Sequence, residues 1–281
     1  MKYDGFISFL EEKNYSETTI ASYELVLNQF FSFLRQLYKK KIELYEIKSK
    51  DIRDYLSTQG DNQKAISTIN KELAILKSYF DYLWERNKVP IDPAAKIKRL
   101  KVQKHLDISL FYEDLLKVKE LVIANTNYTA KRKALFILAM EGLKASEFKF
   151  KKDDVSIIDD RIKINLSNRV ITLDNIDASI FLEFYYNNLL NESEYLFTYT
   201  DSVNNRIIPI TFMGIHYHLK NIQKDYDINQ DLQLTTIRKA LCYYLYINKK
   251  LAVQRIALIM GIEEQTVSIY LSKLTKSMKS I

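Results

Sequence analysis

The sequence predicts a mainly α-helical protein with two domains. Its 281 residues are enough for two domains of ordinary size, and a hydrophobic fraction of 47% supports a packed core in each. Five glycines and three prolines are too few for a strand-rich protein, which needs these residues in its many tight turns. We therefore expect helices to dominate and strands to occupy one short region.

The N-terminal part is expected to form a bundle of four short helices. The predicted ranges are residues 4–12 and 16–38, a helix that starts at Ser49, and residues 67–84. Ser16 and Ser49 are the expected N-caps, because a serine hydroxyl can accept a hydrogen bond from a free backbone N–H. The second helix repeats apolar residues every three or four positions, which places them on one face. These residues are Ile20, Tyr23, Leu27, Phe30 and Leu34.

The C-terminal part is expected to combine helices with a small antiparallel sheet. Helices are predicted over residues 110–124 and 130–140. Residues 155–173 then hold three short runs rich in β-branched side chains, separated by turn residues at 159–160 and 167–168. Short strands joined by tight turns predict a three-stranded antiparallel sheet.

Basic residues outnumber acidic ones and are unevenly distributed. The net charge is +7, and between positions 86 and 104 the only acidic residue is Asp92. Such a balance suits a polyanionic partner, although charge alone does not identify nucleic acid. This stretch includes the basic residues Lys96, Lys98, Arg99, Lys101 and Lys104, and a charge run of this kind by itself is usually a solvated tether.

Several function classes are disfavoured by composition. Cys242 is the only cysteine, which excludes an intrachain disulfide and a cysteine-based zinc site. His216 and His218 are two residues apart, so a helix would place them on different faces and they are not expected to bind a metal. No apolar run approaches the roughly 20 residues of a membrane helix, and the N-terminus lacks the apolar core of a signal peptide. We expect a cytoplasmic protein without a membrane partner, a metal or a cofactor.

Three strings in the first 100 residues carry a family resemblance. Residues 9–23, 67–80 and 91–96 read FLEEKNYSETTIASY, STINKELAILKSYF and IDPAAK. In this order they resemble the core-binding domain of the Xer-type tyrosine recombinases of the phage integrase family, in which NPA is usual where this chain has Asp92. The resemblance implies a four-helix, SAM-like DNA-binding domain over residues 1–95. It further implies a basic linker over 96–105 and an α+β integrase-type catalytic domain over 106–281. Because this linker would join two domains that grip DNA, its residues Lys96, Lys98, Arg99, Lys101 and Lys104 are expected to contact phosphates, which fixes the register on a duplex without reading bases.

The C-terminal half contains strings that resemble the catalytic motifs of the same family. Residues 141–148 read EGLKASEF, residues 235–239 TTIRK, residues 260–262 MGI and residues 266–270 TVSIY. By this resemblance, Arg238 matches the second of two arginines that hold the scissile phosphate. Tyr270 matches the nucleophile, with a spacing from Gly261 one residue shorter than usual. Lys144 stands at the first arginine position, where it keeps the charge but lacks the planar fork that binds phosphate oxygens in pairs.

Other family positions have lost their chemistry. Thr235 replaces a histidine, and a threonine hydroxyl does not titrate near neutral pH. Ile262 replaces a histidine or tryptophan that donates to the phosphate, and Lys239 follows the arginine where a second histidine is common. The family's hairpin lysine has no counterpart in the turn, because Lys163 lies inside the predicted strand. Each lost donor typically costs about 10²–10³ in rate, so these losses predict slow cleavage.

Three hypotheses remain open. The first is a DNA-binding protein of recombinase architecture that takes part in recombination or integration of a mobile element, with cleavage weak or lost. The second is an active site-specific recombinase that uses Tyr270 to form a 3′-phosphotyrosine, with Arg206, Lys239 or His218 as compensating groups. The third is a non-catalytic partner of an active relative. In all three, double-stranded DNA is the expected partner, with self-association or a related recombinase bound through residues 271–281.

Overall fold

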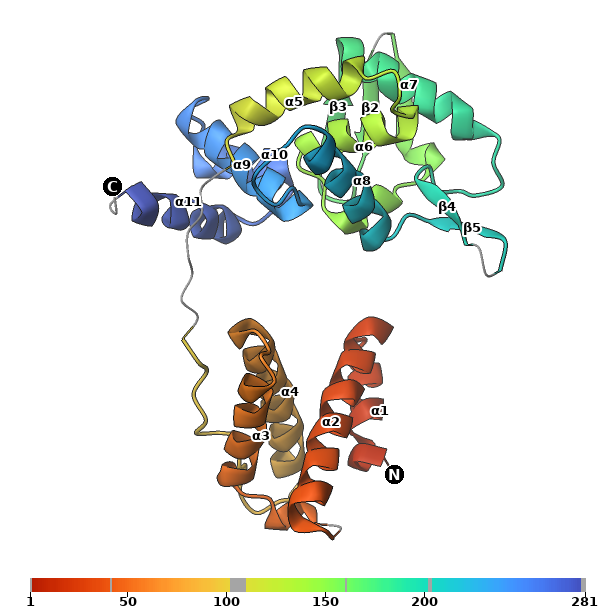
Figure 1. Cartoon of the computed structure of the whole chain (residues 1–281). Coiled ribbons are helices and arrows are strands. Elements are labelled where there is room, and N and C mark those ends of the chain that lie inside the picture. Colours follow the sequence, from red (N-terminus) through yellow and green to blue (C-terminus); the bar gives the residue numbers. More distant parts are fainter. Residues whose placement is uncertain (1, 41, 102–109, 160, 202–203, 279–281) are drawn as a thin grey trace. The chain divides into compact units, whose positions relative to one another are not determined.

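The chain forms two compact units, residues 1–104 and 105–281. The computed structural model describes residues 2–40, 42–101, 110–159, 161–201 and 204–278, without the side chains of residues 2, 4 and 273–278. Both units are mainly helical, and the second also contains a small antiparallel sheet (Figure 1). The predicted fold class is therefore confirmed.

The first unit is a bundle of four helices. Apolar side chains from every helix meet in one core, and the face predicted for the second helix points into it: Leu27, Phe30 and Leu34 are buried, and Ile20 and Tyr23 pack at its edge. Helix α4 contacts both α2 and α3. The helices are α1 (Phe6–Glu12), α2 (Glu17–Tyr38), α3 (Ser49–Asp61) and α4 (Ile66–Glu85).

One of the two predicted helix caps is correct. The Ser16 hydroxyl accepts a hydrogen bond from Thr19 N at 3.3 Å, so Ser16 is the N-cap of α2 as predicted. The prediction for Ser49 is wrong, because α3 already begins at this residue and its N-cap is Lys48. The Asp51 carboxylate accepts from Lys48 N at 2.7 Å. This leaves the Ser49 hydroxyl free to donate to Pro93 O at 2.7 Å.

The segment after α4 is attached to the first unit rather than leaving it directly. Lys77 Nζ donates to Ala95 O at 3.0 Å, and the Ile97 side chain is buried in the core of the bundle. Asn70, in the first turns of α4, then pairs with both main-chain groups of Leu100. Its Oδ1 accepts from Leu100 N at 2.8 Å, and its Nδ2 donates to Leu100 O at 2.9 Å. The basic segment is therefore held in place as far as Leu100.

The sheet of the second unit follows the predicted strands closely. Strands β1 (Val155–Ile158), β2 (Arg161–Asn165) and β3 (Val170–Leu173) form an antiparallel sheet in the order β1-β2-β3. Ile164 pairs with Val155 on one side and with Ile171 on the other. Ile162, Ile164, Ile171 and Leu173 are buried, whereas their neighbours on β2 and β3 are exposed, which is the period of two expected for a sheet with one covered face.

Helix α6 is the centre of the second unit. All its residues from Ala134 to Met140 are buried, and it contacts α5, α7, α8 and α9. Helix α7 was not predicted, because its exposed face also carries apolar residues such as Ile176 and Leu189. The helices are α5 (Tyr112–Ala124), α6 (Ala130–Met140), α7 (Asn175–Leu189), α8 (Phe212–Asp225) and α9 (Leu234–Ile247), and the hairpin strands before α8 are β4 (Thr198–Asp201) and β5 (Arg206–Pro209).

Two further helices complete the second unit. Helices α10 (Val253–Met260) and α11 (Glu264–Met278) pack against each other and against α9. Cys242, Ile256, Met260 and Val267 are fully buried in the small apolar cluster between them. Among the described residues, no helix combines the length and the apolar character that a bilayer crossing requires.

Candidate functional site

The turn that follows α6 brings a lysine to the surface of the second unit. Gly142 has φ = +76°, a conformation that glycine adopts readily and other residues rarely do. A Cβ at this position would lie 2.9 Å from Leu241 Cδ2, so glycine also lets α9 approach the turn. Two residues later, Lys144 is the N-cap of the short 3₁₀ helix η3 (Ala145–Lys149), and its backbone N–H donates to Glu147 Oε2 at 2.7 Å.

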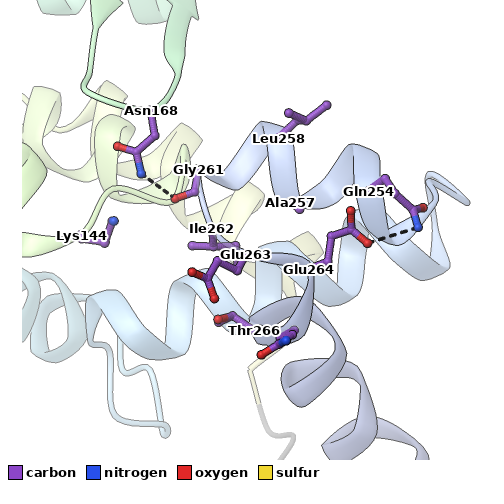
Figure 2. A pocket seen from close by; sticks show the side chains of 11 residues that line it. Lys144, Asn168, Gln254, Ala257, Leu258, Gly261, Ile262, Glu263, Glu264 and Thr266 are labelled. Carbon is purple, nitrogen blue, oxygen red and sulfur yellow. Dashed lines mark hydrogen bonds between the residues drawn. The ribbon is translucent and has the colours of Figure 1, made fainter.

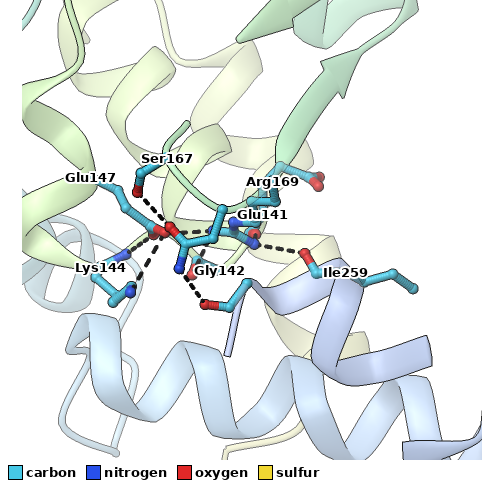
Figure 3. Close-up of polar contacts among 9 residues, drawn as sticks. Glu141, Gly142, Lys144, Glu147, Ser167, Arg169 and Ile259 are labelled. Carbon is cyan, nitrogen blue, oxygen red and sulfur yellow. Dashed lines mark hydrogen bonds and ion pairs between the residues drawn. The ribbon is translucent and has the colours of Figure 1, made fainter. Parts of the chain in front are cut away.

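A buried arginine joins this turn to two other parts of the unit. The Arg169 side chain is 3% exposed. Its Nη1 donates to Glu141 O at 3.1 Å and to Ile259 O at 2.9 Å. Its Nη2 donates to Gly142 O at 3.1 Å and to Glu147 Oε2 at 3.2 Å (Figure 3). Arg169 thus connects the start of β3, the turn after α6 and the end of α10.

The end of α10 is shaped around the same arginine. Gly261, the C-cap of α10, has φ = +58°, and a Cβ there would lie only 2.9 Å from Arg169 Cδ. Asn168 Nδ2 donates to Gly261 O at 3.2 Å, so the residue before Arg169 holds the same turn. Ile262 follows, and its side chain packs at the edge of the apolar cluster of α9, α10 and α11.

A second arginine lies close to the first but has a different environment. Arg238, in the second turn of α9, is 7% exposed, and its Nε and Nη2 are buried without a hydrogen-bond partner among the described residues. Its Cγ is 3.9 Å from the position of a Cβ at Gly142. Burial lowers the pKa of Arg169, Glu147 raises it, and the charge of Arg238 lowers it further, so the two guanidinium groups interact across the Gly142 turn.

A cavity of about 990 Å³ opens beside these turns. Lys144 and Asn168 border it on one side, and the end of α10 and the start of α11 border it on the other (Figure 2). Two carboxylates, Glu263 and Glu264, also line it, and Gln254 Nε2 donates to Glu264 Oε2 at 3.3 Å. The cavity therefore carries two acidic side chains beside one basic side chain.

Comparison with known proteins connects this geometry to a family. The family described as "Phage integrase, N-terminal SAM-like domain" matches residues 3–87. The tyrosine recombinase XerC of Staphylococcus aureus (strain USA300 / TCH1516) is 28% identical over 155 residues, which is 54% of this chain and 51% of that protein. The chain thus spans about half the length of this relative. XerC of Staphylococcus epidermidis (strain ATCC 12228 / FDA PCI 1200) is 26% identical over 222 residues, or 76% of this chain and 72% of the relative.

Solved structures share the fold of the whole chain. XerH site-specific recombinase, in a pre-cleavage complex with its difH substrate, superposes with a TM-score of 0.71 and 18% identity, over 90% of this chain and 77% of that one. The Tn1549 transposon integrase in complex with circular intermediate DNA gives a TM-score of 0.71 and 15% identity, over 95% and 93% of the two chains. The chain is a relative of the tyrosine recombinases.

The structure gathers some of the predicted site residues of this recombinase relative around the Gly142 and Gly261 turns. Lys144 and Ile262 line the cavity, and Arg238 lies against Gly142. Thr235 is exposed in the first turn of α9, on the same side as Arg238 because the two are three positions apart. Lys239, the residue after Arg238, is partly exposed.

Tyr270 lies on α11, in the apolar cluster that α11 shares with α9 and α10. It is partly exposed, and its main-chain oxygen accepts a hydrogen bond from the Tyr243 hydroxyl at 3.1 Å. Ile262 packs at the edge of the same cluster. The side chains of residues 273–281, which include most of the predicted partner-binding segment, lie outside the described residues.

The basic residues expected to contact phosphate are at the surface of the first unit. Lys96, Lys98, Arg99 and Lys101 are exposed, and Lys104 lies outside the described residues. By contrast, Arg86 stacks on aromatic rings of the bundle, with its Cζ 4.1 Å from the centre of the Tyr82 ring.

The hairpin-lysine candidate Lys163 and two of the three residues considered as compensating groups, Arg206 and His218, lie elsewhere. Lys163 lies on β2 and lines a different cavity, together with Arg161 and Asp174. Arg206 is exposed on β5, in the β4–β5 hairpin. His218 is partly buried on α8, where its Nδ1 accepts from Arg132 Nε at 3.4 Å. Among the described residues, no group of three or more His, Cys, Asp or Glu side chains lies close enough to hold a metal ion.

His218 is expected to respond to acid rather than to act as an acid near neutral pH. Burial, together with the charges of Lys131 and Arg132, lowers its pKa from 6.5 to about 4. Between these values the unfolded chain binds a proton that the folded chain does not, so the free energy of unfolding falls as the pH drops from 6.5 towards 4. Thermal unfolding is measured at pH 7 and at pH 4.5. The fall in melting temperature between these two pH values should be smaller for His218→Gln than for the unmodified protein. An equal loss in both would contradict the pKa assignment.

Sequence reasoning missed Arg169, although a signal for it exists. Arg169 directly precedes β3 and lies in the same alternating register as Ile171 and Leu173, which are on the buried face of the strand. An arginine in register with buried residues of a strand is expected to have buried partners, because an unpaired charge there would be costly. Glu147 was noticed only as part of a motif, and the structure shows that it is the charged partner of Arg169.

Proposed function

We propose that this chain is a DNA-binding protein of tyrosine recombinase architecture that acts in DNA recombination or integration, with strand cleavage weak or lost. Its substrate is double-stranded DNA, and the phosphate backbone is the part that it binds most strongly. The fold and the XerC relatives support the role in recombination. The environment of Arg238 is the observation on which the proposed contact with phosphate depends.

Arg238 supports a phosphate ligand because it is a buried cation with unused donors. Its Nε and Nη2 have no partner among the described residues. Leaving a charged donor buried and unpaired is unfavourable, and a buried arginine normally has an anionic partner. A guanidinium donates two parallel hydrogen bonds to a phosphate, so a DNA phosphate fits the missing partner in charge and in geometry. Lys144, across the Gly142 turn, would add a second positive charge.

The exposed basic residues of the first unit support a duplex rather than a small phosphate. Lys96, Lys98, Arg99 and Lys101 are exposed on a segment that is held to the bundle by Asn70. Cations fixed in this way can contact successive phosphates and release their counterions. The XerH and Tn1549 integrase structures are complexes with DNA.

Weak or lost cleavage is supported by the residues at the other family positions and by the acidic lining of the cavity. Thr235 offers a hydroxyl that cannot titrate near neutral pH, and the Ile262 side chain has no donor. Glu263 and Glu264 line the cavity next to Lys144, where they would repel a phosphate. Each lost donor is worth about 10²–10³ in rate, so the combined losses leave little catalysis.

Two assays test this function. Affinity for a 30-base-pair duplex should fall steeply between about 50 and 200 mM salt, and a flat response would contradict phosphate binding. In parallel, the protein is incubated with a pool of nicked duplexes and run on a denaturing gel. We expect no covalent adduct. An adduct that disappears in Tyr270→Phe would instead establish an active recombinase.

The two carboxylates of the cavity give a further prediction. Replacing both Glu263 and Glu264 with glutamine should raise the affinity for duplex DNA about 5- to 30-fold at low salt, because each like charge near a phosphate contributes on the order of 1 kcal/mol of repulsion in water. The gain should shrink as salt increases. Glu183→Gln, an exposed carboxylate of α7 that does not line the cavity, is the matched control. Equal gains in both variants would count against a phosphate near the cavity.

We also propose that the protein self-associates on DNA. The lambda integrase structure with the same fold is a dimer bound to a COC′ core site, and it superposes with a TM-score of 0.67 at 15% identity. Sedimentation of the protein with a duplex should then show more than one chain per DNA molecule. A complex of one chain per duplex at saturating protein would overturn this part of the proposal.

A further inference from the structure

We infer that Arg169 is the positioning residue of the phosphate site: it holds the Gly142 and Gly261 turns in the arrangement that keeps Arg238 and Lys144 ready for a phosphate. The inference rests on the proposed function, because it assigns a role within the same site. It concerns a residue that does not itself touch the DNA.

Arg169 cannot act as a phosphate ligand. Its side chain is 3% exposed, and both of its terminal nitrogens are engaged by the protein. Three of the four acceptors are main-chain carbonyls, those of Glu141, Gly142 and Ile259. An arginine bound to carbonyls on two sides of a turn fixes the backbone, because each hydrogen bond defines the position of one peptide group.

The first connection leads to Lys144 through Glu147. One carboxylate oxygen, Glu147 Oε2, accepts from Arg169 Nη2 at 3.2 Å and from the backbone N–H of Lys144 at 2.7 Å. The position of the Lys144 backbone therefore depends on a carboxylate that Arg169 holds. The Lys144 ammonium itself is 3.9 Å from Glu147 Oε1, so it is only loosely attached and can turn towards a ligand.

The second connection leads to Arg238 through Gly142. A Cβ at Gly142 would lie 3.9 Å from Arg238 Cγ and 4.0 Å from Arg169 Nη1, so both arginines border the space that a side chain at this position would fill. Arg169 Nη2 holds this residue by its carbonyl oxygen. If the turn moved, the stem of Arg238 would lose the surface that it packs against, and its guanidinium would lose its fixed direction.

The third connection leads to α10 and the rim of the cavity. Arg169 Nη1 donates to Ile259 O in the last turn of α10, and the Arg169 Cδ occupies the space left by the missing side chain of Gly261. Asn168 holds Gly261 O from the neighbouring position. Ile262, Glu263 and Glu264, which line the cavity, follow directly in the chain. One side chain thus sets both edges of the site.

Only arginine can make these contacts together. Its guanidinium offers five donors in a rigid plane, whereas a lysine ammonium offers three donors around a single point. A lysine at position 169 keeps the charge next to Glu147 but cannot reach acceptors on both sides. Arg169→Lys is therefore a variant that preserves the ion pair and removes the positioning.

A double-mutant cycle separates positioning from a merely structural role. Binding to a 30-base-pair duplex is measured for Arg169→Lys, Arg238→Met and the double variant, with thermal unfolding recorded for each. We expect Arg169→Lys to weaken binding about tenfold in the otherwise unmodified protein and less than about twofold in the Arg238→Met background, a coupling within the range seen for residues of one network. Arg161→Lys, an exposed arginine of the same sheet paired with Asp174, is the matched control and should bind as the unmodified protein does.

The outcomes distinguish this inference from the proposed function. If Arg238→Met does not weaken binding, the phosphate contact itself is wrong. If Arg238→Met weakens binding but the effects of the two substitutions add, the phosphate contact stands and the positioning role is overturned. The Nε–H resonance of Arg238, measured by NMR without DNA, gives a second readout. It should shift in Arg169→Lys and not in Arg161→Lys, and an unchanged resonance would also overturn the inference. Glu147→Gln, which keeps one acceptor oxygen but removes the negative charge that holds Arg169, replaces Arg169→Lys in both measurements if that variant does not fold.

Discussion

Replacing Arg238 with methionine is expected to make the free protein more stable and to make it a weaker binder of DNA. Arg238 is 7% exposed as a residue, and its guanidinium has buried donors without partners among the described residues. An apolar side chain of similar length removes this unpaired charge, and comparable replacements of buried ionic groups stabilise proteins by about 1–4 kcal/mol. A hydrogen bond from a charged group to phosphate is worth about 1.5–3 kcal/mol, so affinity should fall roughly 10- to 150-fold.

Opposite changes in the two quantities are the signature of a binding residue. Calorimetry of the free protein gives the change in melting temperature, and titration of a fluorescent duplex gives the change in Kd. Arg255→Met is a suitable control, because Arg255 is an exposed arginine on α10 and should alter stability little. If Arg238→Met instead lowered both stability and affinity, Arg238 would be a structural residue and the proposed phosphate contact would lose its support.

Replacing Arg169 with methionine should have the opposite effect on stability. The substitution removes the guanidinium from which three main-chain carbonyls accept hydrogen bonds. It also leaves Glu147, 8% exposed, with only the Lys144 ammonium, 3.9 Å away, as a cationic neighbour. Breaking a buried ion pair from one side typically costs about 3–5 kcal/mol. For a unit of this size that corresponds to a fall in melting temperature of roughly 6–20 °C.

A second substitution shows where this loss arises. Replacing Glu147 as well, in Arg169→Met/Glu147→Met, removes the carboxylate that the first change left unpaired, so the double variant should unfold at a higher temperature than Arg169→Met alone. Scanning calorimetry of the full chain compares the three proteins. A double variant less stable than Arg169→Met would mean that the stability lies in the carbonyl contacts and in the Glu147 contact to Lys144, and not in the ion pair.

The sequence predicted the fold well, because periodicity reports which faces are buried. The spacing of Leu27, Phe30 and Leu34 identified the inner face of α2, and the alternation along residues 161–173 identified the sheet. The cap of α3 was mispredicted because a local rule favoured Ser49, whereas the serine hydroxyl is used by Pro93, 44 residues away in the chain. Contacts of that kind depend on tertiary structure, which local patterns do not contain.

Only part of the candidate site could be predicted, because several of its contacts also depend on tertiary structure. The resemblance identified Lys144, Arg238 and Ile262, which the structure places around two glycine turns. It did not identify Arg169, because the acceptors of this arginine are carbonyls at positions 141, 142 and 259, and main-chain groups leave no mark in a sequence. The acidic lining of the cavity was also missed, because only the folded chain brings Glu263 and Glu264 into the same cavity as Lys144.

The two hydrogen bonds between the Asn70 carboxamide and the main chain of Leu100 have a practical consequence for anyone who expresses the first unit alone. A fragment that stops at residue 95 would lack Ile97, which fills part of the bundle core. It would also lack Leu100, so the Asn70 carboxamide would lose both of its main-chain hydrogen-bond partners. A fragment that extends to Lys101 keeps the buried Ile97 side chain and the Asn70–Leu100 hydrogen bonds, and is the better starting point for crystals or spectra of that unit.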